Sequence, residues 1–195
     1  MKFSLTIIFI TLLVLISFVK NNIDDEISWT MEDLYYNEDI RLIQASLKAK
    51  QEIATKDENI KYQEFAFYFG RDKQSRSLFY KILIGKIITK YNIEIYKVIV
   101  KLTDDNKANY EIVSTEKLDN YRSVSVNNIE YFRINKLISK YFFRNKYDYY
   151  SILNMKKIEN YYIIEPKLGN NKSQIAFVIY DQGYFFVSTT VSFND

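Results

Sequence analysis

The feature that most limits how this 195-residue chain can fold is an unbroken apolar segment at residues 3–19, FSLTIIFITLLVLISFV. These seventeen residues contain no charge, no Gly and no Pro. As an α-helix they would extend roughly 25 Å, which is close to the thickness of the hydrocarbon core of a bilayer. A helix that is apolar on every side at the end of a chain is typical of a membrane segment and not of a soluble core. The body of the protein must therefore fold from the residues that follow.

Two interpretations of residues 3–19 are open, a retained anchor and a cleaved signal peptide. A basic residue precedes the segment, but an Ala-x-Ala cleavage site is missing, because only Ser17 is small near its end. We therefore expect residues 1–20 to be a membrane anchor or uncleaved signal and residues 21–29 to be a short polar connector. Residues 30–195 would form a domain outside the cytoplasm, on a single-pass protein of the cell membrane. The alternative is a secreted or periplasmic protein after signal cleavage.

The composition of the remaining chain suits one folded domain. Its length is enough to bury a core of its own. The chain has no Cys, which excludes a lipid-modified Cys and means that an exported body relies on packing instead of disulfides. With four Gly and one Pro, the chain has no flexible linker and no proline-rich ligand segment. The sequence therefore predicts one domain without low-complexity linkers.

Charge is distributed unevenly along this body. Residues 20–58 hold five Lys and Arg against ten Asp and Glu, whereas residues 59–195 hold twenty-one against fourteen. An excess of basic residues can serve an anionic partner, such as phospholipid headgroups, an acidic protein or nucleic acid. Because no basic run is longer than Lys156-Lys157, we favour an acidic helix packed on a mildly basic sheet.

The apolar spacing of the first part of the body predicts a helix followed by strands. Thr30 with Asp33, and Asn37 with the acids that follow it, are two candidate helix starts. Apolar residues then recur at helical spacing to about residue 55. Runs rich in β-branched and aromatic residues predict antiparallel strands at 62–69, 78–88, 91–102 and 108–115, with a turn at 104–106. The alternative for residues 78–88 is a helix.

The second part of the body shows the same order, a helix and then strands. A helix is predicted from Asn127-Asn128 to about residue 143, followed by a looser helical or irregular stretch at 148–158. Three strands follow, at residues 161–165, 174–180 and 184–193. The predicted fold class is α+β, with an N-terminal membrane-spanning helix and then one domain of about two helices packed on a mainly antiparallel sheet. The two parts suggest a degenerate repeat, but no aligned residues support one.

The residue types that are missing exclude much of enzyme chemistry. Without His and Cys, the chain cannot form a Ser-His-Asp or Cys-His site, an imidazole base, or ordinary zinc, haem or iron–sulfur ligation. It also contains no Gly-x-Gly-x-x-Gly or Walker pattern for a phosphate loop. The sequence predicts no catalytic residue, no metal site and no cofactor.

Two weak patterns for an enzyme occur nonetheless. Ser114 and Lys117 have the Ser-x-x-Lys spacing that places an amine beside a serine on a helix, but they follow a predicted strand, so we interpret them as a chance match. Asp104, Asp105 and Glu111 could act as a carboxylate pair in glycoside cleavage or as calcium ligands. Acids between two strands are more often a solvated hairpin tip. A hydrolase that uses carboxylates and tyrosines is the alternative function.

Basic and aromatic residues alternate most densely over residues 131–150. The candidate binding residues in this segment, for a partner protein or a membrane surface, are Arg133, Lys136, Lys140, Tyr141, Phe142, Arg144, Lys146 and Tyr149. Such a segment could dock a partner protein, lie on an anionic membrane, or stack on sugars or bases. The alternative is an amphipathic helix whose aromatic residues are core and whose basic residues extend to solvent.

These observations together predict a membrane-anchored, extracytoplasmic module that binds to or assembles with a bacterial envelope complex and catalyses no reaction. The lack of Cys is compatible with a bacterial envelope. The expected partners are other envelope proteins or further copies of the chain, and residues 3–19 are the expected contact with the membrane. Nucleic acid is disfavoured as a partner, because the N-terminal segment indicates export.

Overall fold

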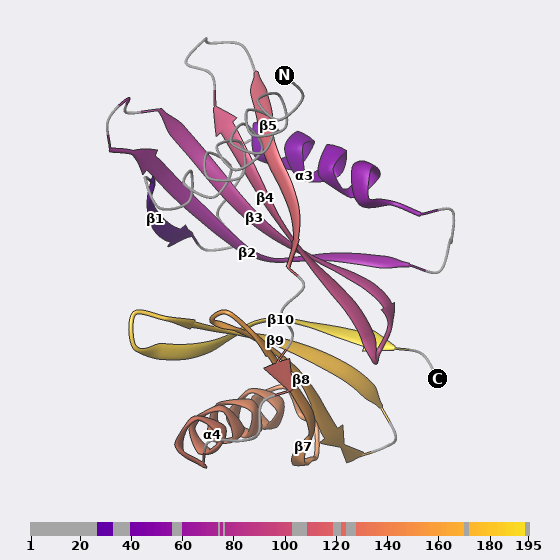
Figure 1. Ribbon diagram of the computed structural model, residues 1–195. Helices are drawn as coiled ribbons and strands as arrows, with labels where there is room; N and C mark the ends of the chain where they lie inside the picture. Colours follow the sequence, from indigo (N-terminus) through magenta and orange to yellow (C-terminus); the bar gives the residue numbers. More distant parts are fainter. Residues whose placement is uncertain are drawn as a thin grey trace, which may run out of the picture.

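The structure of this chain is a computed structural model (Figure 1). It describes residues 27–32, 40–55, 60–73, 75, 77–102, 109–118, 122–123, 128–169 and 172–193. The apolar segment 3–19, Asn37 and the predicted turn at 104–106 lie outside these residues. In the part of the chain that is described, neither helix combines the length and the apolar character needed to cross a bilayer.

The first sheet is a meander of five antiparallel strands. In spatial order these are β1 (Ile27–Glu32), β2 (Lys61–Asp72), β3 (Leu78–Thr89), β4 (Asn92–Leu102) and β5 (Tyr110–Leu118). β-Branched and aromatic residues are frequent in β2, β3 and β4, and these residue types pack well in a pleated sheet. The register places Gly70 of β2 between Trp29 of β1 and Phe79 of β3.

The second sheet is another antiparallel meander, formed by the later part of the chain. In spatial order its strands are β6 (Arg122–Ser123), β7 (Tyr149–Ile158), β8 (Tyr161–Leu168), β9 (Ser173–Asp181) and β10 (Tyr184–Phe193). Gln182 and Gly183 join β9 to β10, and both take positive φ angles, 46° and 88°. A two-residue type I′ turn requires positive φ at both positions, so this turn fixes the register of the hairpin.

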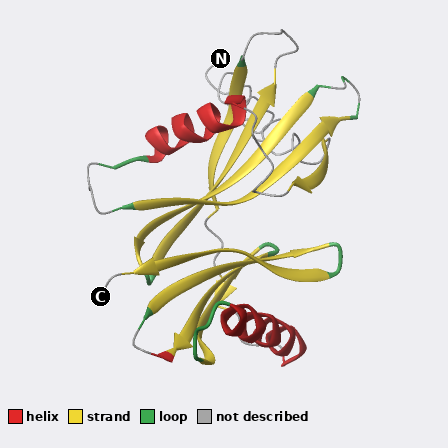
Figure 2. Ribbon diagram, turned by 180° about the vertical axis from the view of Figure 1, so that it is seen from behind, coloured by secondary structure: helices red, strands yellow, loops and turns green. Residues whose placement is uncertain are grey.

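Two helices cover the outer faces of the two sheets. They are α3 (Ile40–Ile53) and α4 (Asn128–Arg144). Buried side chains of α3 pack with those of β3 and β4, whereas buried side chains of α4 pack with those of β8 and β9. The body is thus a stack of four layers, in the order helix, sheet, sheet, helix (Figures 1 and 2). α3 and α4 lie on opposite outer sides of this stack.

The two halves of the body have the same order of elements. Each half begins with a strand, continues with a helix, and ends with a meander of four longer strands. In the first half β1 pairs with β2 across α3, and in the second half β6 pairs with β7 across α4. The structure therefore supplies the repeat that the sequence only suggested, in topology and not in aligned residues.

The predicted packing of two helices against antiparallel strands is confirmed, and strands make up most of the described structure. The prediction of a single sheet is wrong, because the strands form two sheets that pack face to face. The reason lies in the burial of β3 and β9, which have long runs of buried residues and are covered on both faces. Such strands need a layer on each side. Each of them has a helix on one face and the other sheet on the opposite face, which a single sheet could not provide.

Residues 149–158 form the strand β7 and not the looser helical or irregular stretch that the sequence predicts. Two irregularities in its pairing with β8, between Tyr149 and Ser151 and between Ile152 and Asn154, explain the error. Each inserts an extra residue, so Tyr149, Ile152 and Met155 all reach the core under α4 with a spacing of three. A spacing of three resembles a helix when it is judged from the sequence alone.

The first strand also differs from the prediction. β1 begins at Ile27, inside the stretch 21–29 that we expected to be a connector, and Thr30 lies within β1 and so cannot cap a helix. The side chains of Ile27, Trp29 and Met31 alternate toward the core, whereas Ser28 and Thr30 are exposed. Residues 78–89 are the strand β3, so the helical alternative for this segment is wrong.

The largest core cluster lies between the two sheets. Phe65 of β2 stacks on Phe177 of β9, with ring centroids 4.7 Å apart and an interplanar angle of 14°. The ring of Tyr161, from β8, meets Phe65 edge-on at 5.9 Å. Gly85 of β3 leaves room for this packing, because a Cβ atom there would lie 3.1 Å from the Phe177 ring. Aromatic contacts between strands of different sheets therefore hold the two halves together.

We expect a Gly70→Ala substitution to displace β1. A Cβ atom at Gly70 would lie 2.4 Å from Ile27 Cγ2 and 2.6 Å from the ring of Trp29, so these β1 side chains would have to move. Overpacking of this kind costs about 1–3 kcal/mol of unfolding free energy. Trp29 is the only tryptophan, and Lys81 Nζ lies 4.5 Å above its ring. Displacement of β1 should expose the Trp29 ring to water, so its fluorescence maximum should shift to longer wavelength before global unfolding.

The matched control is Ser28→Ala, which changes an exposed side chain of the same strand. This variant should keep the fluorescence and the stability of the unaltered chain. An unchanged Trp29 spectrum in the Gly70→Ala variant would contradict the packing of β1 described above.

Candidate functional site

The inner face of α4 is fixed by three fully buried side chains. Ile134, Ile138 and Phe142 recur every four residues and therefore lie on one side of the helix. They pack against the outer face of the second sheet, on Tyr162 and Ile164 among others. This packing fixes the rotation of α4 about its axis, and so it determines which side chains face solvent.

The C-terminal end of α4 is closed by a Schellman motif. Lys146 takes a left-handed conformation with φ of 61°. Its N–H donates to the carbonyl of Phe143 at 3.1 Å, and the N–H of Tyr147 donates to the carbonyl of Phe142 at 2.9 Å. Lys146 is exposed, but it lies past the end of the helix. The basic side chains of α4 itself therefore end at Arg144.

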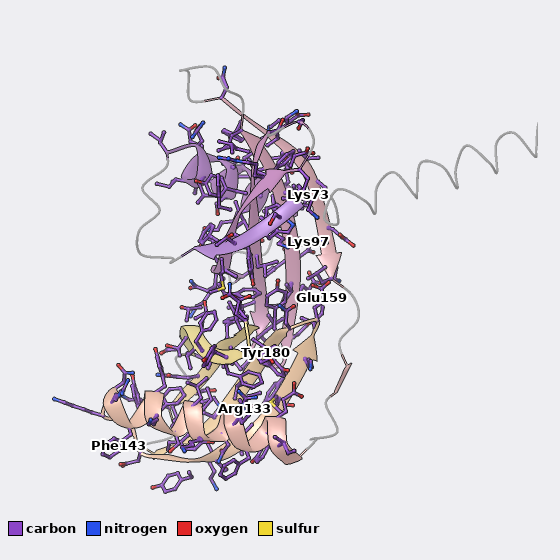
Figure 3. The ribbon with its side chains drawn as sticks, turned by 90° about the vertical axis from the view of Figure 1, so that its left-hand side faces the viewer. Lys73, Lys97, Arg133, Phe143, Glu159 and Tyr180 are labelled. Atoms are coloured by element: carbon purple, nitrogen blue, oxygen red, sulfur yellow. The ribbon has the colours of Figure 1, made fainter. Side chains whose placement is uncertain are left out.

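The described side chains on the exposed side of α4 are all basic or large and apolar. Among the described side chains of the helix, the exposed ones are Ile129, Phe132, Arg133, Lys136, Lys140, Phe143 and Arg144, a set that we call the α4 outer face. Phe143 is 80% exposed, Ile129 73% and Phe132 66%. No acidic residue belongs to this set. Arg133 and Phe143 are labelled in Figure 3.

One of these basic side chains also joins the helix to the second sheet. Arg133 donates a hydrogen bond of 2.9 Å to the carbonyl of Gly183 in the β9–β10 turn. Its guanidinium group lies 5.2 Å from the centroid of the Phe185 ring. The neighbouring Tyr184 is 75% exposed and extends the aromatic surface beyond the helix. This turn is therefore continuous with the α4 outer face.

The one acidic residue of α4 already has partners. Glu130 accepts hydrogen bonds from Lys157 Nζ, at 2.9 Å, and from the hydroxyl of Tyr162. Burial alone would raise the pKa of Glu130, but the bonds from Tyr162 and Lys157 outweigh it and lower this pKa below its usual value. Glu130 is therefore ionised, and its charge is balanced by Lys157 at the flank of the helix.

The structure divides the predicted binding residues into two groups. Arg133, Lys136, Lys140 and Arg144 lie together on the α4 outer face, and Lys146 is exposed just beyond it. The remaining three are not part of this exposed face: Phe142 is buried, and Tyr141 and Tyr149 are half-buried.

Tyr149 makes contacts within the fold through both its hydroxyl group and its ring. Its hydroxyl donates to Asn135 Oδ1 of α4, and its ring is stacked parallel to that of Phe142. Burial, with a smaller contribution from the nearby Tyr131, raises the pKa of Tyr149 to about 12. Tyr149 therefore helps to hold α4 on β7.

Three residues of the α4 outer face were not among the candidate binding residues predicted from the sequence, namely Ile129, Phe132 and Phe143. Their positions relative to the basic residues, at steps of three and four from 129 to 143, would have placed them on the same stripe. An exposed apolar stripe and a buried one have the same spacing, and only the packing of the inner face distinguishes them.

The helix α3 offers a natural comparison. Its exposed side chains are Ile40, Ile43, Gln44, Leu47, Lys48, Gln51 and Glu52. Both helices thus expose three large apolar side chains, but α3 carries one base and one acid, whereas α4 carries four bases. Of these two helices, as far as their side chains are described, α4 alone combines apolar exposure with a charge of one sign.

A second polar group lies beneath the C-terminal half of α3. Lys86 of β3 is only 5% exposed, and its Nζ donates to the carbonyl of Ile53 at 3.0 Å. Glu94 Oε2 lies 3.8 Å from the same nitrogen, and Glu94 also accepts from Lys117 at 2.7 Å and from the hydroxyl of Tyr96 at 3.0 Å. These bonds satisfy a helix end and a carboxylate, so the cluster is structural.

The acidic side of this cluster should make stability depend on pH. The hydrogen bond from Lys117 lowers the pKa of Glu94, with burial opposing and Tyr96 adding to this effect. The stabilisation from Glu94 is therefore fully present above its usual pKa of 4.5 and is lost as the pH falls through the lower folded-state pKa. We expect Glu94→Gln to flatten the dependence of unfolding free energy on pH between about pH 3 and pH 5.

The measurement is urea unfolding of the full chain across this pH range. Glu52→Gln is the control, since it removes an exposed carboxylate of α3. If Glu94→Gln and Glu52→Gln flatten the dependence of unfolding free energy on pH equally, the role given to Glu94 is contradicted.

The described residues offer little that resembles an active site. A small pocket between the sheets is lined by Lys90, Ile93, Asn154, Lys156, Ile163, Glu165 and Ile175, and so it holds one carboxylate. Ser114 and Lys117 lie on β5 three residues apart, which places them on opposite faces, and Lys117 pairs with Glu94. Among these residues, no group of three acids forms a metal site. Glu111 is exposed, and Asp104 and Asp105 lie outside the described residues.

Comparison of the chain with protein-family models, with curated proteins and with solved structures finds no match.

Proposed function

We propose that this protein is a membrane-anchored binding module of the bacterial envelope that carries out no catalysis. Residues 3–19 would hold it in the cell membrane, and the four-layer body would lie outside the cytoplasm. The observation that carries the proposal is the α4 outer face, on which seven neighbouring side chains are exposed and none is acidic. Large apolar side chains that are exposed together usually mark a surface that another molecule covers.

The alternative, a hydrolase that uses carboxylates and tyrosines, has less support. Such an enzyme needs two carboxyl groups that face each other across a substrate. Among the described residues, Glu64, Glu94 and Glu130 each bond to a lysine, and Glu165 is the one acid of the pocket between the sheets. Bonded carboxylates of this kind stabilise the fold and are poorly suited to act as an acid and a base.

The structure also bears on the class of partner. The basic charge of the α4 outer face suits an anionic partner, which could be an acidic envelope protein or the membrane. A further copy of the chain would have to bring an acidic surface to this face, and the α3 side of the body has no excess of acid on its exposed helix residues. Nucleic acid remains disfavoured, because the proposed location is outside the cytoplasm.

The proposal is tested by adding protease to intact spheroplasts that express the full-length chain with a C-terminal tag. We expect the body to be digested from outside, while a fragment that contains residues 3–19 stays in the membrane fraction. If the protease removes the tag only after the spheroplasts are lysed, the body lies in the cytosol and the proposal is overturned. A mature protein that begins after residue 20 would show that residues 1–20 are a cleaved signal and not an anchor.

A further inference from the structure

We infer that the α4 outer face binds the surface of an anionic phospholipid bilayer, an inference that rests on the proposed function and names the partner of its binding surface. The body would then be held to the membrane at two places, by residues 3–19 and by α4. The inference depends on the arrangement of the exposed side chains, on their charge, and on the contrast with α3.

The arrangement is a single stripe along the whole helix. At 100° per residue, positions 129, 132, 136, 140 and 143 fall within a narrow sector of the helix surface. Positions 133 and 144 lie at one edge of the same sector. This stripe is opposite to Ile134, Ile138 and Phe142, which are buried against the second sheet. A flat surface such as a bilayer could therefore meet all seven side chains at once.

The charge of the stripe selects an anionic surface. Its four basic side chains come from both ends and the middle of the helix, and Glu130, at its flank, is neutralised by Lys157 at 2.9 Å. Anionic lipids attract clusters of Lys and Arg that lie near the membrane. Charge complementarity is therefore the first argument for a lipid partner.

The apolar side chains give the second argument. Ile129 and Phe132 precede the basic residues along the stripe, and Phe143 lies between Lys140 and Arg144. Each of the three apolar side chains is more than three-fifths exposed. A helix that lies in the interface of a bilayer places apolar side chains below the headgroups and basic side chains among the phosphates. This mixture of apolar and basic side chains suits the interface of a bilayer better than it suits an acidic protein. Basic residues alone would be enough to complement the charge of an acidic protein.

The comparison with α3 predicts a direction for the bound body. α3 exposes as many large apolar residues, but its exposed Lys48 and Glu52 cancel. Because α3 and α4 cover opposite sides of the stack, binding through α4 would leave α3 facing away from the membrane (Figures 1 and 2). A probe on each helix can therefore distinguish docking from random tumbling.

The test uses the full-length chain in vesicles of phosphatidylcholine, with or without phosphatidylglycerol, and a lipid-borne quencher. Because the chain has no Cys, a fluorophore can be placed on a single introduced site, Phe143→Cys on α4 or Ile43→Cys on α3. We expect quenching of the α4 probe to be several-fold greater in the anionic vesicles, and to fall in high salt. The α3 probe should show little quenching in either lipid.

A charge-reversal variant provides the decisive comparison. Lys136→Glu, Lys140→Glu and Arg144→Glu together should reduce the ratio of docked to undocked protein at least roughly tenfold, to the level seen in phosphatidylcholine. The matched control carries Lys48→Glu, Arg71→Glu and Lys167→Glu, which change net charge equally at exposed sites away from α4. Circular dichroism of both variants checks that the two sheets and helices are retained.

Two results would overturn the inference. Equal quenching of the α3 and α4 probes would show no preferred orientation, and equal loss of quenching in both triple variants would show attraction by net charge alone. If α4 does not dock on vesicles but protease digests the body from outside, the proposed function stands, with an acidic protein as the partner. Docking in vesicles together with a cytosolic body in spheroplasts would instead contradict the proposed location.

Discussion

The Phe142→Ala variant should lose roughly 3–5 kcal/mol of unfolding free energy, whereas Phe143→Ala should change it by less than about 0.5 kcal/mol. Phe142 is fully buried, and its ring packs edge-on against Tyr141 and Tyr147 at 5.3 and 5.8 Å. Removing it leaves a cavity beneath α4. Phe143 points 100° away from Phe142 around the helix axis, and it is 80% exposed.

Urea unfolding of the full chain in detergent micelles, followed by far-ultraviolet circular dichroism, measures this difference. The two adjacent phenylalanines serve as controls for each other, because both variants lose the same side chain from the same turn of α4. Similar losses of stability would contradict the rotation of the helix, and with it the membership of the α4 outer face. Vesicle docking should show the reverse order, with Phe143→Ala weakening it.

A Phe65→Ala variant should also lose roughly 3–5 kcal/mol, because Phe65 is fully buried at the centre of the contact between the sheets. It stacks on Phe177 and meets Tyr161 edge-on, so its removal leaves two aromatic rings of the second sheet without their partner. The backbone carbonyl of Phe65, which accepts a bond from Ser188 Oγ, stays in place. The loss therefore reports on aromatic packing between the halves.

The control for this variant is Tyr184→Ala, which removes an aromatic ring exposed in the β9–β10 turn and should alter stability by less than about 0.5 kcal/mol. If the halves are one cooperative unit, Phe65→Ala lowers the midpoint of a single transition. Two separate transitions, or a loss below that of an ordinary surface substitution, would contradict a shared core.

Much of the fold could be predicted from local patterns in the sequence. The strands at 92–102 and 184–193 have runs of β-branched and aromatic residues bounded by polar turns, and the structure confirms them. The helix at 128–144 was predicted from Ile134, Leu137, Ile138 and Tyr141, whose spacing is helical. These signals are local, because each depends on residues only a few positions apart.

The errors arose where the deciding contact is distant in sequence. β1 is a strand because β2 pairs with it across α3, from Ile27 opposite Asp72 to Glu32 opposite Phe67. The division into two sheets depends on which faces of the strands pack together. The alternation of apolar and polar residues along a strand does not reveal whether a helix or a second sheet covers its buried face. β7 was missed because two irregularities in its pairing gave it a spacing of three.

The candidate site shows the same limit. The sequence indicated the basic and aromatic segment as a candidate binding surface, but it could not separate Phe142 from Phe143. Adjacent aromatic residues on a helix point in directions that differ by 100°, and only the packing of Ile134 and Ile138 decides which of them is buried. The burial of each side chain therefore shows which of the eight candidates lie together on one exposed face of α4.

The most direct test of the account is the rate at which a membrane-impermeant maleimide labels Phe143→Cys and Ile43→Cys in spheroplasts that express the full-length chain. Side-chain exposure alone would favour position 143, at 80% against 50% for position 43. We predict the opposite, with rapid labelling on α3 from outside and labelling on α4 several-fold slower until detergent dissolves the membrane. Labelling of both sites only after lysis, or faster labelling at position 143 in intact spheroplasts, would contradict the account.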